Sequence, residues 1–295
     1  MMHAIEVDNL DLYYGGEVQA LDGVSFALDG GKIYGLLGRN GAGKSSLLSI
    51  LAAFRRPSGG EVRIGGQPVW ENAAVMRDIC LIRETADTVE HSESVVAAFD
   101  FAAHMRPRWD AEYARELIEK FEIPDRDKIS ELSRGKRAAL WVILGLASRA
   151  PVTLFDEPYI GMDAPSRYIF YEEILSDFIE HPRTIVVSTH LIEEVASLFE
   201  EVVIIDRGTL VLHEDADTLR ARGVAVTGPA EQVDQFVEGM TVLNSKQLGP
   251  TRSVMVYGNL GDDERRRARG AGLELEALPL QDLFVHLTRP AGGAG

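Results

Sequence analysis

The chain has 295 residues, 45% of them hydrophobic, which is enough for one large domain and a smaller one, each with its own core. Its 46 acidic residues outnumber its 30 lysines and arginines, and the net charge of −16 argues against binding of nucleic acid through a basic surface. A single cysteine, Cys80, excludes an internal disulfide and is typical of a reducing compartment.

No segment of the sequence has the length and composition of a membrane span. Residues 1–12 carry three carboxylates and no apolar run, so we expect no signal peptide. The longest apolar run, 138–147, is far shorter than the ~20 residues that cross a bilayer. The chain is therefore predicted to be soluble, and work at a membrane would require a separate spanning subunit.

The first predicted elements are two strands of an antiparallel hairpin, residues 4–14 and 20–28. Tyr14 ends the first strand beside a pair of glycines, where its ring could stack on an adenine. Taken alone, a half-buried strand tyrosine is the simpler explanation for this residue.

A glycine loop then joins a strand-like run, 32–37, to a helix-like run, 46–54. Residues 38–45 have the pattern G-x-x-x-x-G-K-S of a phosphate-binding loop, in the strand–loop–helix context that such a loop requires. Backbone N–H groups of the loop and the positive end of the helix dipole attract phosphate. Lys44 is predicted to contact the β- and γ-phosphates, and Ser45 to hold Mg²⁺. The residues expected to contact nucleotide here are Gly38, Arg39, Asn40, Gly41, Ala42, Gly43, Lys44, Ser45 and Ser46.

The middle of the chain changes from strand to helical patterns. The apolar run 79–82 predicts a buried strand, and amphipathic helices are predicted over 94–105 and 111–121. A helix over 137–147 is apolar nearly all round and must be buried. Ser133, just before it, is the candidate N-cap.

Two carboxylates, Asp156 and Glu157, end an apolar strand that begins at Pro151. Downstream of a phosphate loop, this pattern is typical of a metal-site acid followed by a general base. Asp156 is predicted to hold Mg²⁺ through water, and Glu157 to polarise the attacking water. The alternative is two solvated acids at a strand end.

His190 ends a further apolar strand, 184–190. Ligands of open α/β sheets bind at the carboxyl ends of the strands. Three strands of parallel type end at Gly38, Asp156 and His190, so His190 is predicted to face the γ-phosphate, although a lone histidine is more often structural.

In their order and spacing, these motifs resemble the nucleotide-binding subunit of an ATP-binding-cassette (ABC) transporter over about residues 5–222. The resemblance implies an α/β P-loop NTPase cassette with a mixed sheet core, an antiparallel β subdomain and a helical subdomain at about 85–149. It implies ATP and Mg²⁺ as ligands, favours the adenine-stacking role of Tyr14, and makes Lys44, Glu157 and His190 the catalytic residues.

The resemblance also implies roles for residues that no single motif reveals. Glu84 falls where the family usually has a glutamine that contacts Mg²⁺ and the attacking water. Residues 132–136 fall at the signature motif, commonly L-S-G-G-Q, which acts on the nucleotide of the other copy through Ser133 and the Gly135 N–H. Asp163 belongs to the loop that crosses to the partner copy.

Two departures from the family pattern bear on the mechanism. The signature has Arg134 and Lys136 in place of glycine and glutamine. These charges could favour ATP at the interface between copies, or they could be solvated bases with no role. Glu84 cannot donate a hydrogen bond while ionised, which affects the coupling rather than the nucleotide site.

A domain boundary is predicted after Arg222. Alternating strand and helix patterns then predict a small α+β domain over 223–289, followed by a disordered tail, 290–295. The end of this domain resembles the S-L-E-D-x-F-x-x-L-T ending of exporter-type subunits. A packing or dimer-supporting appendage is preferred here over a ligand sensor.

The predicted function is the ATP-binding and hydrolysing subunit of a transporter, with export favoured by the C-terminal ending. Two copies are expected to close head to tail around two ATP molecules. A membrane-spanning permease is expected to dock on residues 84–105, which places the subunit in the cytoplasm at the inner face of the cell membrane. The alternatives are a soluble ABC ATPase not coupled to transport and an adapter that binds ATP without turnover.

Overall fold

The structure, a computed structural model, describes residues 3–83 and 93–288. Glu84 and the predicted tail, 290–295, lie outside the described residues. The chain divides into two compact units, one of Met1–His190 with Val203–His213 and a second of Leu191–Val202 with Glu214–Gly295. The predicted boundary after Arg222 stays a prediction. Among the described helices, none combines the length and the apolar composition that a membrane crossing requires.

A six-stranded sheet in the order β10-β9-β3-β8-β7-β6 forms the centre of the first unit. β3, β8, β7 and β6 pair in parallel. The sequence predicts this type for β3, β7 and β8, and a buried strand for β6. All five residues of β3 and of β7 are buried, because helices and a second sheet cover both faces of these strands. The strands of this sheet are β3 (Ile33–Leu37), β6 (Ile79–Arg83), β7 (Val152–Asp156), β8 (Thr184–Thr189), β9 (Glu201–Asp206) and β10 (Thr209–Asp215).

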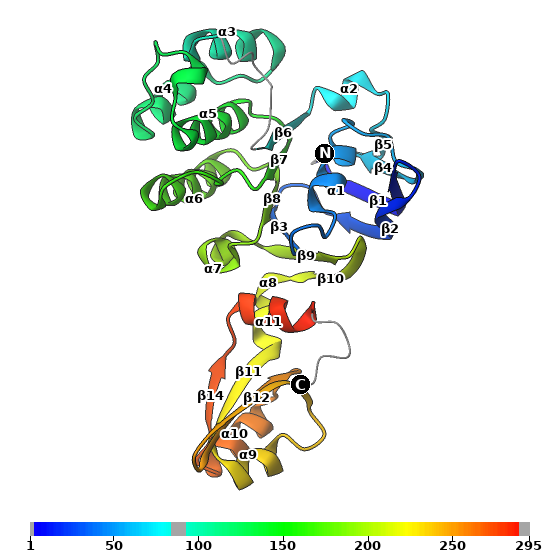
Figure 1. The fold of residues 1–295 in the computed structure, drawn as a ribbon, viewed down its shortest axis with the longest axis vertical. Helices are drawn as coiled ribbons and strands as arrows, with labels where there is room; N and C mark the ends of the chain where they lie inside the picture. The colour runs from blue at the N-terminus through cyan, green and yellow to red at the C-terminus, as the bar shows by residue number, and fades with distance from the viewer. Residues whose placement is uncertain (1–2, 84–92, 289–295) are drawn as a thin grey trace. The chain divides into compact units, whose positions relative to one another are not determined.

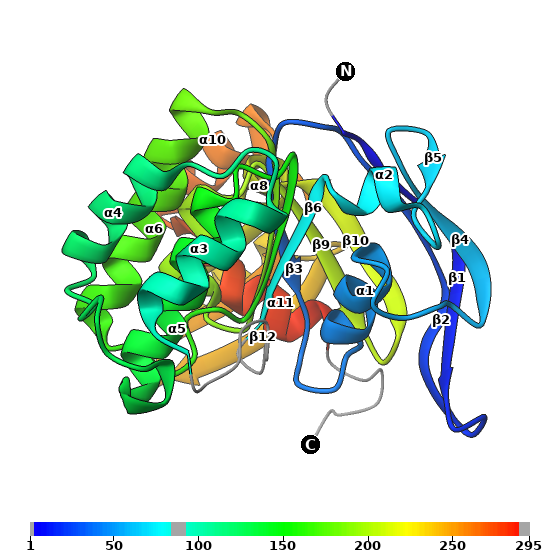
Figure 2. The ribbon, with the colours of Figure 1, turned by 90° about the horizontal axis from the view of Figure 1, so that it is seen from above.

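The predicted hairpin is confirmed and belongs to a four-stranded antiparallel sheet in the order β2-β1-β4-β5. Leu47 and Leu48 of helix α1 (Lys44–Leu51) are completely buried in the hydrophobic core that both sheets share. Figures 1 and 2 show α1 on the side of the parallel strands that faces this second sheet. The strands are β1 (Ile5–Tyr14), β2 (Val18–Leu28), β4 (Gly59–Ile64) and β5 (Gln67–Pro68).

Helices α3 to α6 lie on the opposite side of the parallel strands (Figures 1 and 2). The predicted helix at 137–147 begins three residues earlier, because Ser133 caps it by accepting a hydrogen bond from the Lys136 N–H. This helix packs closely on β6, since a side chain at position 145 would place its Cβ atom only 2.7 Å from Ile82 Cγ1. The bounds of these helices are α3 (Val95–Met105), α4 (Ala111–Lys120), α5 (Arg134–Ala147) and α6 (Ala164–Glu180). The short helix α2 (Ala73–Met76) comes between β5 and β6.

The second unit contains the predicted α+β domain. Its elements run strand, helix, strand, strand, helix, strand, and the sheet order β12-β13-β11-β14 is that of a split βαβ, ferredoxin-like fold. Val226 and Val256 face its buried core. The elements are α7 (Ile192–Val195), α8 (Ala216–Arg222), β11 (Gly223–Pro229), α9 (Ala230–Phe236), β12 (Thr241–Leu248), β13 (Thr251–Tyr257), α10 (Asp262–Gly270), β14 (Glu274–Ala277) and α11 (Leu280–Leu287).

A buried ion network joins α4, α5 and α6 of the first unit to the start of β8. The guanidinium of Arg149 pairs with Asp110, with Nη2 at 3.0 Å from Oδ2, and also with Asp177. Arg183 Nη2 lies 2.6 Å from Asp177 Oδ2, and the Asp177 side chain is only 1% exposed. Burial alone would raise the pKa of the Asp110 carboxyl, but the Tyr113 N–H and the Arg149 guanidinium hold that pKa below its ordinary value.

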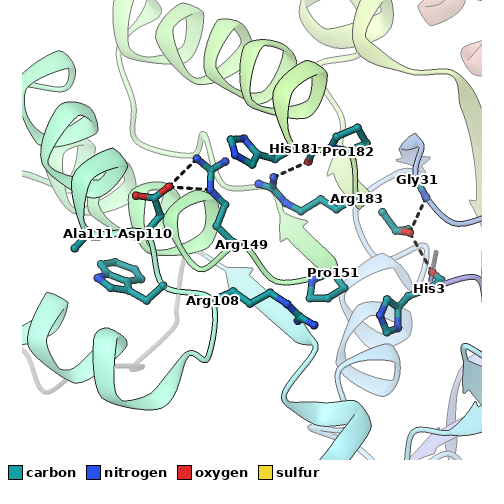
Figure 3. Close-up of a pocket in the computed structure, with 12 residues that line it drawn as sticks. His3, Gly31, Arg108, Asp110, Ala111, Arg149, Pro151, His181, Pro182 and Arg183 are labelled. Carbon is teal, nitrogen blue, oxygen red and sulfur yellow. Dashed lines mark hydrogen bonds and ion pairs between the residues drawn. The ribbon is translucent and has the colours of Figure 1, made fainter. Parts of the chain in front are cut away.

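This network forms one wall of a cavity of about 770 Å³, shown in Figure 3. Arg149 is directed at Asp110, and Arg183 at the backbone oxygen of His181. The guanidinium groups are therefore occupied by groups of the protein itself, and the network acts as a structural cross-link.

We expect Asp177→Ala to lower the free energy of unfolding by about 3–5 kcal/mol, because it leaves two buried guanidinium groups without their shared carboxylate. Urea denaturation followed by circular dichroism measures the loss. Asp29→Ala removes a carboxylate that is 81% exposed and paired with Lys32. This control should change the stability by less than about 0.5 kcal/mol. Equal losses in the two variants would contradict the cross-link.

Candidate functional site

A cavity of about 630 Å³ lies at the carboxyl ends of β3, β6 and β7, where the sequence predicts the nucleotide. The glycine loop, which joins β3 to α1 (Figure 2), contributes residues 39–46 together with the start of α1 to the lining. The hairpin and the ends of β6 and β7 supply the rest. The lining residues are Tyr14, Val18, Gln19, Ala20, Arg39, Asn40, Gly41, Ala42, Gly43, Lys44, Ser45, Ser46, Arg83, Asp156, Glu157 and Ile160.

The glycines of the loop are required by its geometry. Gly41 and Gly43 have φ angles of 79° and 107°, in the left-handed region that side chains disfavour. A Cβ on Gly43 would also lie 2.7 Å from the Ala20 carbonyl oxygen, and one on Gly38 equally close to that of Ile205. The loop thus leads into a helix whose first-turn N–H groups have no intrahelical acceptor and suit an anion.

Lys44 is held in the cavity by acceptors on several sides. Its Nζ lies 2.7 Å from the Gly38 carbonyl oxygen and 3.1 Å from Glu157 Oε1, and its side chain is 5% exposed. An ammonium group among oxygen acceptors in the wall of a cavity fits the phosphate chain of a nucleotide.

The side-chain oxygens of Asp156 and Ser45 fit a magnesium ion that the nucleotide phosphates would also coordinate. Asp156 Oδ1 accepts a 2.8 Å hydrogen bond from Ser188 Oγ, and the carboxylate and Ser45 both line the cavity. Mg²⁺ in such sites takes only one or two protein oxygens and completes its shell with water and phosphate. Consistently, the described residues contain no cluster of three metal-ligating side chains.

Glu157 is placed by an unusual backbone conformation. Its φ of 49° is left-handed, which costs a non-glycine residue about 1–2 kcal/mol. Its N–H donates to Ser188 Oγ at 3.0 Å, which offsets part of that cost. Ser188 therefore contacts both acidic residues, the carboxylate of Asp156 and the main chain of Glu157. This role was not identifiable from the sequence, because nothing local distinguishes a serine inside an apolar strand.

His190 lies beside the same carboxylate. Its Nδ1 is 3.1 Å from Glu157 Oε2, so Lys44 and His190 contact the two oxygens of Glu157. The backbone N–H of His190 donates to the hydroxyl of Tyr159 at 3.1 Å. That hydroxyl also lies 2.8 Å from Thr189 Oγ1. Tyr159 thus holds the tip of β8, a position that no sequence pattern marked.

Tyr14 lines the cavity with its ring 36% exposed. Its hydroxyl lies 3.0 Å from Ser46 Oγ, which fixes the ring against the start of α1. The guanidinium carbon of Arg55 lies 4.4 Å from the ring centroid, a cation–π distance. The strand tyrosine is therefore positioned as an aromatic wall of the cavity.

Comparison with known proteins identifies the family. Residues 21–160 match the family model described as ABC transporter. The doxorubicin resistance ATP-binding protein DrrA of Mycobacterium tuberculosis (strain CDC 1551 / Oshkosh) is 30% identical over 225 residues, 74% of this chain and 68% of that protein. The chain belongs to the ABC transporter ATP-binding proteins. It is an ATPase whose hydrolysis of ATP powers transport.

Other relatives extend over nearly the whole chain. The daunorubicin resistance ATP-binding protein DrrA3 of Streptomyces coeruleorubidus is 27% identical over 97% of this chain and 96% of its own length. The Nod factor export ATP-binding protein I of Sinorhizobium fredii (strain NBRC 101917 / NGR234) is 27% identical over 97% of this chain and 86% of its own.

Solved structures confirm the cassette fold. An ATP-binding subunit of an ABC transporter superposes with a TM-score of 0.65 at 23% identity, covering 73% of this chain and 91% of that one. The dimeric, post-hydrolysis cassette MJ0796 bound to ADP and Pi gives 0.64 at 21% identity, covering 72% of this chain and 98% of that one.

Ser133, Gly135 and Asp163 are absent from the lining of the nucleotide cavity of this ABC ATPase, as are Gly38 and His190. Ser133 caps α5, and Asp163 caps α6 by accepting from the Ser166 N–H at 2.9 Å. A Cβ on Gly135 would lie 2.8 Å from the Gly161 carbonyl oxygen. The signature therefore packs against the loop that leads to Asp163.

The two substituted signature residues have distinct local contacts. Lys136 Nζ donates to the Phe121 carbonyl oxygen at 2.6 Å, so it ties α5 to the end of α4. The Arg134 side chain lies against Gly161, and a Cβ atom added to Gly161 would lie only 2.7 Å from Arg134 Cγ. Neither residue is simply a solvated base.

Arg83 is a cavity residue that no sequence motif marked. It ends β6, and its Nη2 donates to Ser49 Oγ at 3.4 Å. Ser49 in turn donates to the Ser45 carbonyl oxygen at 2.5 Å. Arg83 thereby supports the helix turn that carries Ser45. The sequence feature that could have indicated this residue is its position at the end of the strand predicted from the apolar run 79–82.

We expect Tyr159→Phe to lower kcat for ATP hydrolysis about fivefold, because His190 loses one hydrogen bond worth about 1 kcal/mol. KM for ATP should stay unchanged, since the hydroxyl does not line the cavity. Steady-state phosphate release measures both constants. Tyr168→Phe, at a tyrosine that is 64% exposed, is the matched control. An unchanged kcat in Tyr159→Phe would show that Tyr159 does not position His190.

Proposed function

We propose that two copies of this ABC ATPase close head to tail around two ATP molecules and drive export through a separate permease, at the cytoplasmic face of the cell membrane. The observation that supports this is a divided site. Lys44, Asp156 and Glu157 share one cavity, whereas Ser133 and Gly135 of the same chain lie outside it. A second copy is the natural source of the missing half.

In the proposed reaction Lys44 binds the β- and γ-phosphates, and Tyr14 stacks on the adenine. Magnesium, held by Ser45 and through water by Asp156, would neutralise charge on the same phosphates. Glu157 accepts a proton from the water that attacks the γ-phosphorus, and the bond to ADP breaks to give ADP and phosphate. His190 holds the Glu157 carboxylate and faces the γ-phosphate.

The ion pair between Lys44 and Glu157, with 3.1 Å between Nζ and Oε1, suggests how binding prepares the site. A phosphate that takes Lys44 as its partner frees one oxygen of Glu157 for the attacking water. Ser188 and His190 keep the carboxylate in place meanwhile. Substrate binding would in this way activate the base.

The other half of the site is proposed to come from the partner's α5. Its Ser133 hydroxyl and Gly135 N–H would contact the γ-phosphate, next to the positive end of the α5 dipole. Arg134 and Lys136 would keep the signature loop fixed to Gly161 and to the end of α4. The Arg134 charge at the start of α5 adds to the attraction for phosphate.

A groove beside α3 is the proposed docking site of the permease. It has a volume of about 380 Å³ and is lined by side chains of α2, β6 and α3. Met76, Phe101 and Met105 line it and are 42%, 52% and 61% exposed. An apolar face of a cytoplasmic permease helix fits a groove of this composition. Residues 84–92 of the predicted docking region lie outside the described residues.

The names of the relatives favour export as the direction of transport. Two of them are resistance proteins for daunorubicin or doxorubicin, and a third is a Nod factor export protein. DrrA3 and the Nod factor protein match nearly the whole of this chain, including its C-terminal unit. The cargo would be selected by the permease.

Glu157→Gln should lower ATP turnover at least ~10²-fold, because the amide cannot accept the proton of the attacking water. Nucleotide affinity should be retained, since Lys44 and the glycine loop are unchanged. Phosphate release and titration with a fluorescent ATP analogue measure the two effects. Glu172→Gln, at an exposed carboxylate on α6, should behave as wild type. Turnover near the wild-type rate in Glu157→Gln would rule out Glu157 as the base.

Phe101→Asp should abolish co-purification with the permease from detergent-solubilised membranes, because a carboxylate cannot be buried against an apolar partner helix without a counterion. The basal ATPase rate of the isolated subunit should not change. Ile179→Asp, at a residue of α6 that is 70% exposed and outside the groove, is the control. Recovery of the permease with Phe101→Asp at the wild-type level would exclude this docking site.

A further inference from the structure

A smaller cavity lies in the first unit where the chain leaves α1 and enters β4. Its volume is about 320 Å³, and none of its lining residues also lines the nucleotide cavity. Ile50, Val62 and Val69 form a buried apolar floor. A volume of this size is at the lower end of cavities that hold small ligands, roughly 300–1,000 Å³.

Two neighbouring arginines, Arg55 and Arg56, stand in the wall of this cavity. Across residues 3–83 and 93–288, neither of them pairs with a carboxylate. The single acid in the lining, Glu61, is engaged by Arg63, whose Nε and Nη2 lie 2.9 Å and 2.8 Å from Oε1. Both arginines are exposed, so their guanidinium groups are accessible from solvent.

The larger cavity of Figure 3 provides the contrast. Its guanidinium groups from Arg149 and Arg183 are engaged by Asp110 and Asp177. Arg108 there also has a partner, with its Nη1 2.6 Å from Asp78 Oδ1. The arginines of the larger cavity therefore serve the fold, whereas Arg55 and Arg56 retain their N–H groups for a ligand.

The other lining groups define the class of ligand. Ser58 Oγ accepts from the Tyr13 N–H at 3.0 Å, which leaves the hydroxyl proton to donate. Trp70, 37% exposed, adds an aromatic side wall above the apolar floor. Guanidinium forks and a hydroxyl bind phosphate oxygens, and an indole with aliphatic side chains packs against an organic body. We propose that this cavity binds a phosphate ester.

Arg55 connects this site to the nucleotide cavity. Its guanidinium carbon lies 4.4 Å from the ring centroid of Tyr14, whose hydroxyl is fixed to Ser46. A phosphate in the small cavity competes with the ring for this guanidinium and loosens Tyr14. Loss of a contact of this kind raises KM for ATP roughly two- to fivefold. This coupling rests on the proposed function of Tyr14, whereas the site itself does not.

Binding is tested on the full chain by isothermal titration calorimetry, with ADP and Mg²⁺ at saturation so that the nucleotide cavity is filled. Glycerol 3-phosphate and inorganic phosphate are the soluble ligands to titrate. Arg56→Ala should weaken binding at least ~10-fold, because a charge-assisted pair of hydrogen bonds is lost. Arg126→Ala, at an exposed arginine in the segment after α4, should bind as wild type does. Equal affinities for wild type and Arg56→Ala would overturn the site.

Vesicles distinguish a lipid head group from a soluble ester. Sedimentation with vesicles of phosphatidylcholine, with and without phosphatidylglycerol, is compared for wild type and Arg56→Ala. Arg56-dependent binding to the phosphatidylglycerol vesicles alone assigns a lipid head group, and Arg56-dependent binding of glycerol 3-phosphate alone assigns a soluble ester. Either result supports the phosphate site. Failure of every ligand to bind overturns it.

The coupling is tested by KM for ATP with and without the ligand that binds. KM should rise in wild type and stay constant in Arg55→Ala. A ligand that binds but leaves the wild-type KM unchanged overturns the coupling and not the site. If the wild-type chain bound the ligand but showed no ATPase activity, the proposed function would be overturned and the phosphate site would stand.

Discussion

Parallel pairing of β3, β8 and β7 is the constraint on which the site depends. Parallel strands end at one edge of a sheet, and here Leu37 pairs with Thr189, and Asp156 with Ser188. This register brings the glycine loop, the two carboxylates and His190 together, although they are spread over more than half of the chain. The ion pair of Lys44 with Glu157 is its direct result. The strands that set this register, β3 and β7, are buried on both faces, as parallel strands usually are.

Much of this site could be predicted, because its principal residues follow strand ends in patterns that have a chemical reason. The supporting residues could not. Ser188, Tyr159 and Arg83 act through partners about thirty residues away, which no local pattern encodes. In the fold, the parallel strands and the buried α5 were predictable from apolar runs, whereas β12 was not. It is a polar, largely exposed edge strand that carries Asn244 and Lys246, so the hydrophobic pattern that marks a strand is absent.

The signature region shows how the fold separates tasks. Ser133 and Gly135 lie at the start of α5, whose apolar body is buried, and Gly135 packs on Gly161, in the loop that follows β7 and Glu157. One short loop thus connects the residue that the signature packs against, Gly161, with Glu157, the carboxylate proposed as the base. Arg134 lies against the same glycine, whereas Lys136 ties α5 to the end of α4 through the Phe121 carbonyl oxygen. The sequence alone left open whether these two residues have any role, because both contacts are set by tertiary packing.

We propose that one hydrolytic site is built from two copies of the chain, and mixing two inactive variants is the experiment that tests this. Lys44→Ala removes the phosphate lysine, and Ser133→Ala removes the signature hydroxyl, so each variant alone should lack ATPase activity. In a mixed dimer one site combines the intact phosphate loop of one copy with the intact Ser133 of the other. We expect mixing to restore turnover. A mixture that forms dimers with ATP but stays as inactive as its components would contradict it.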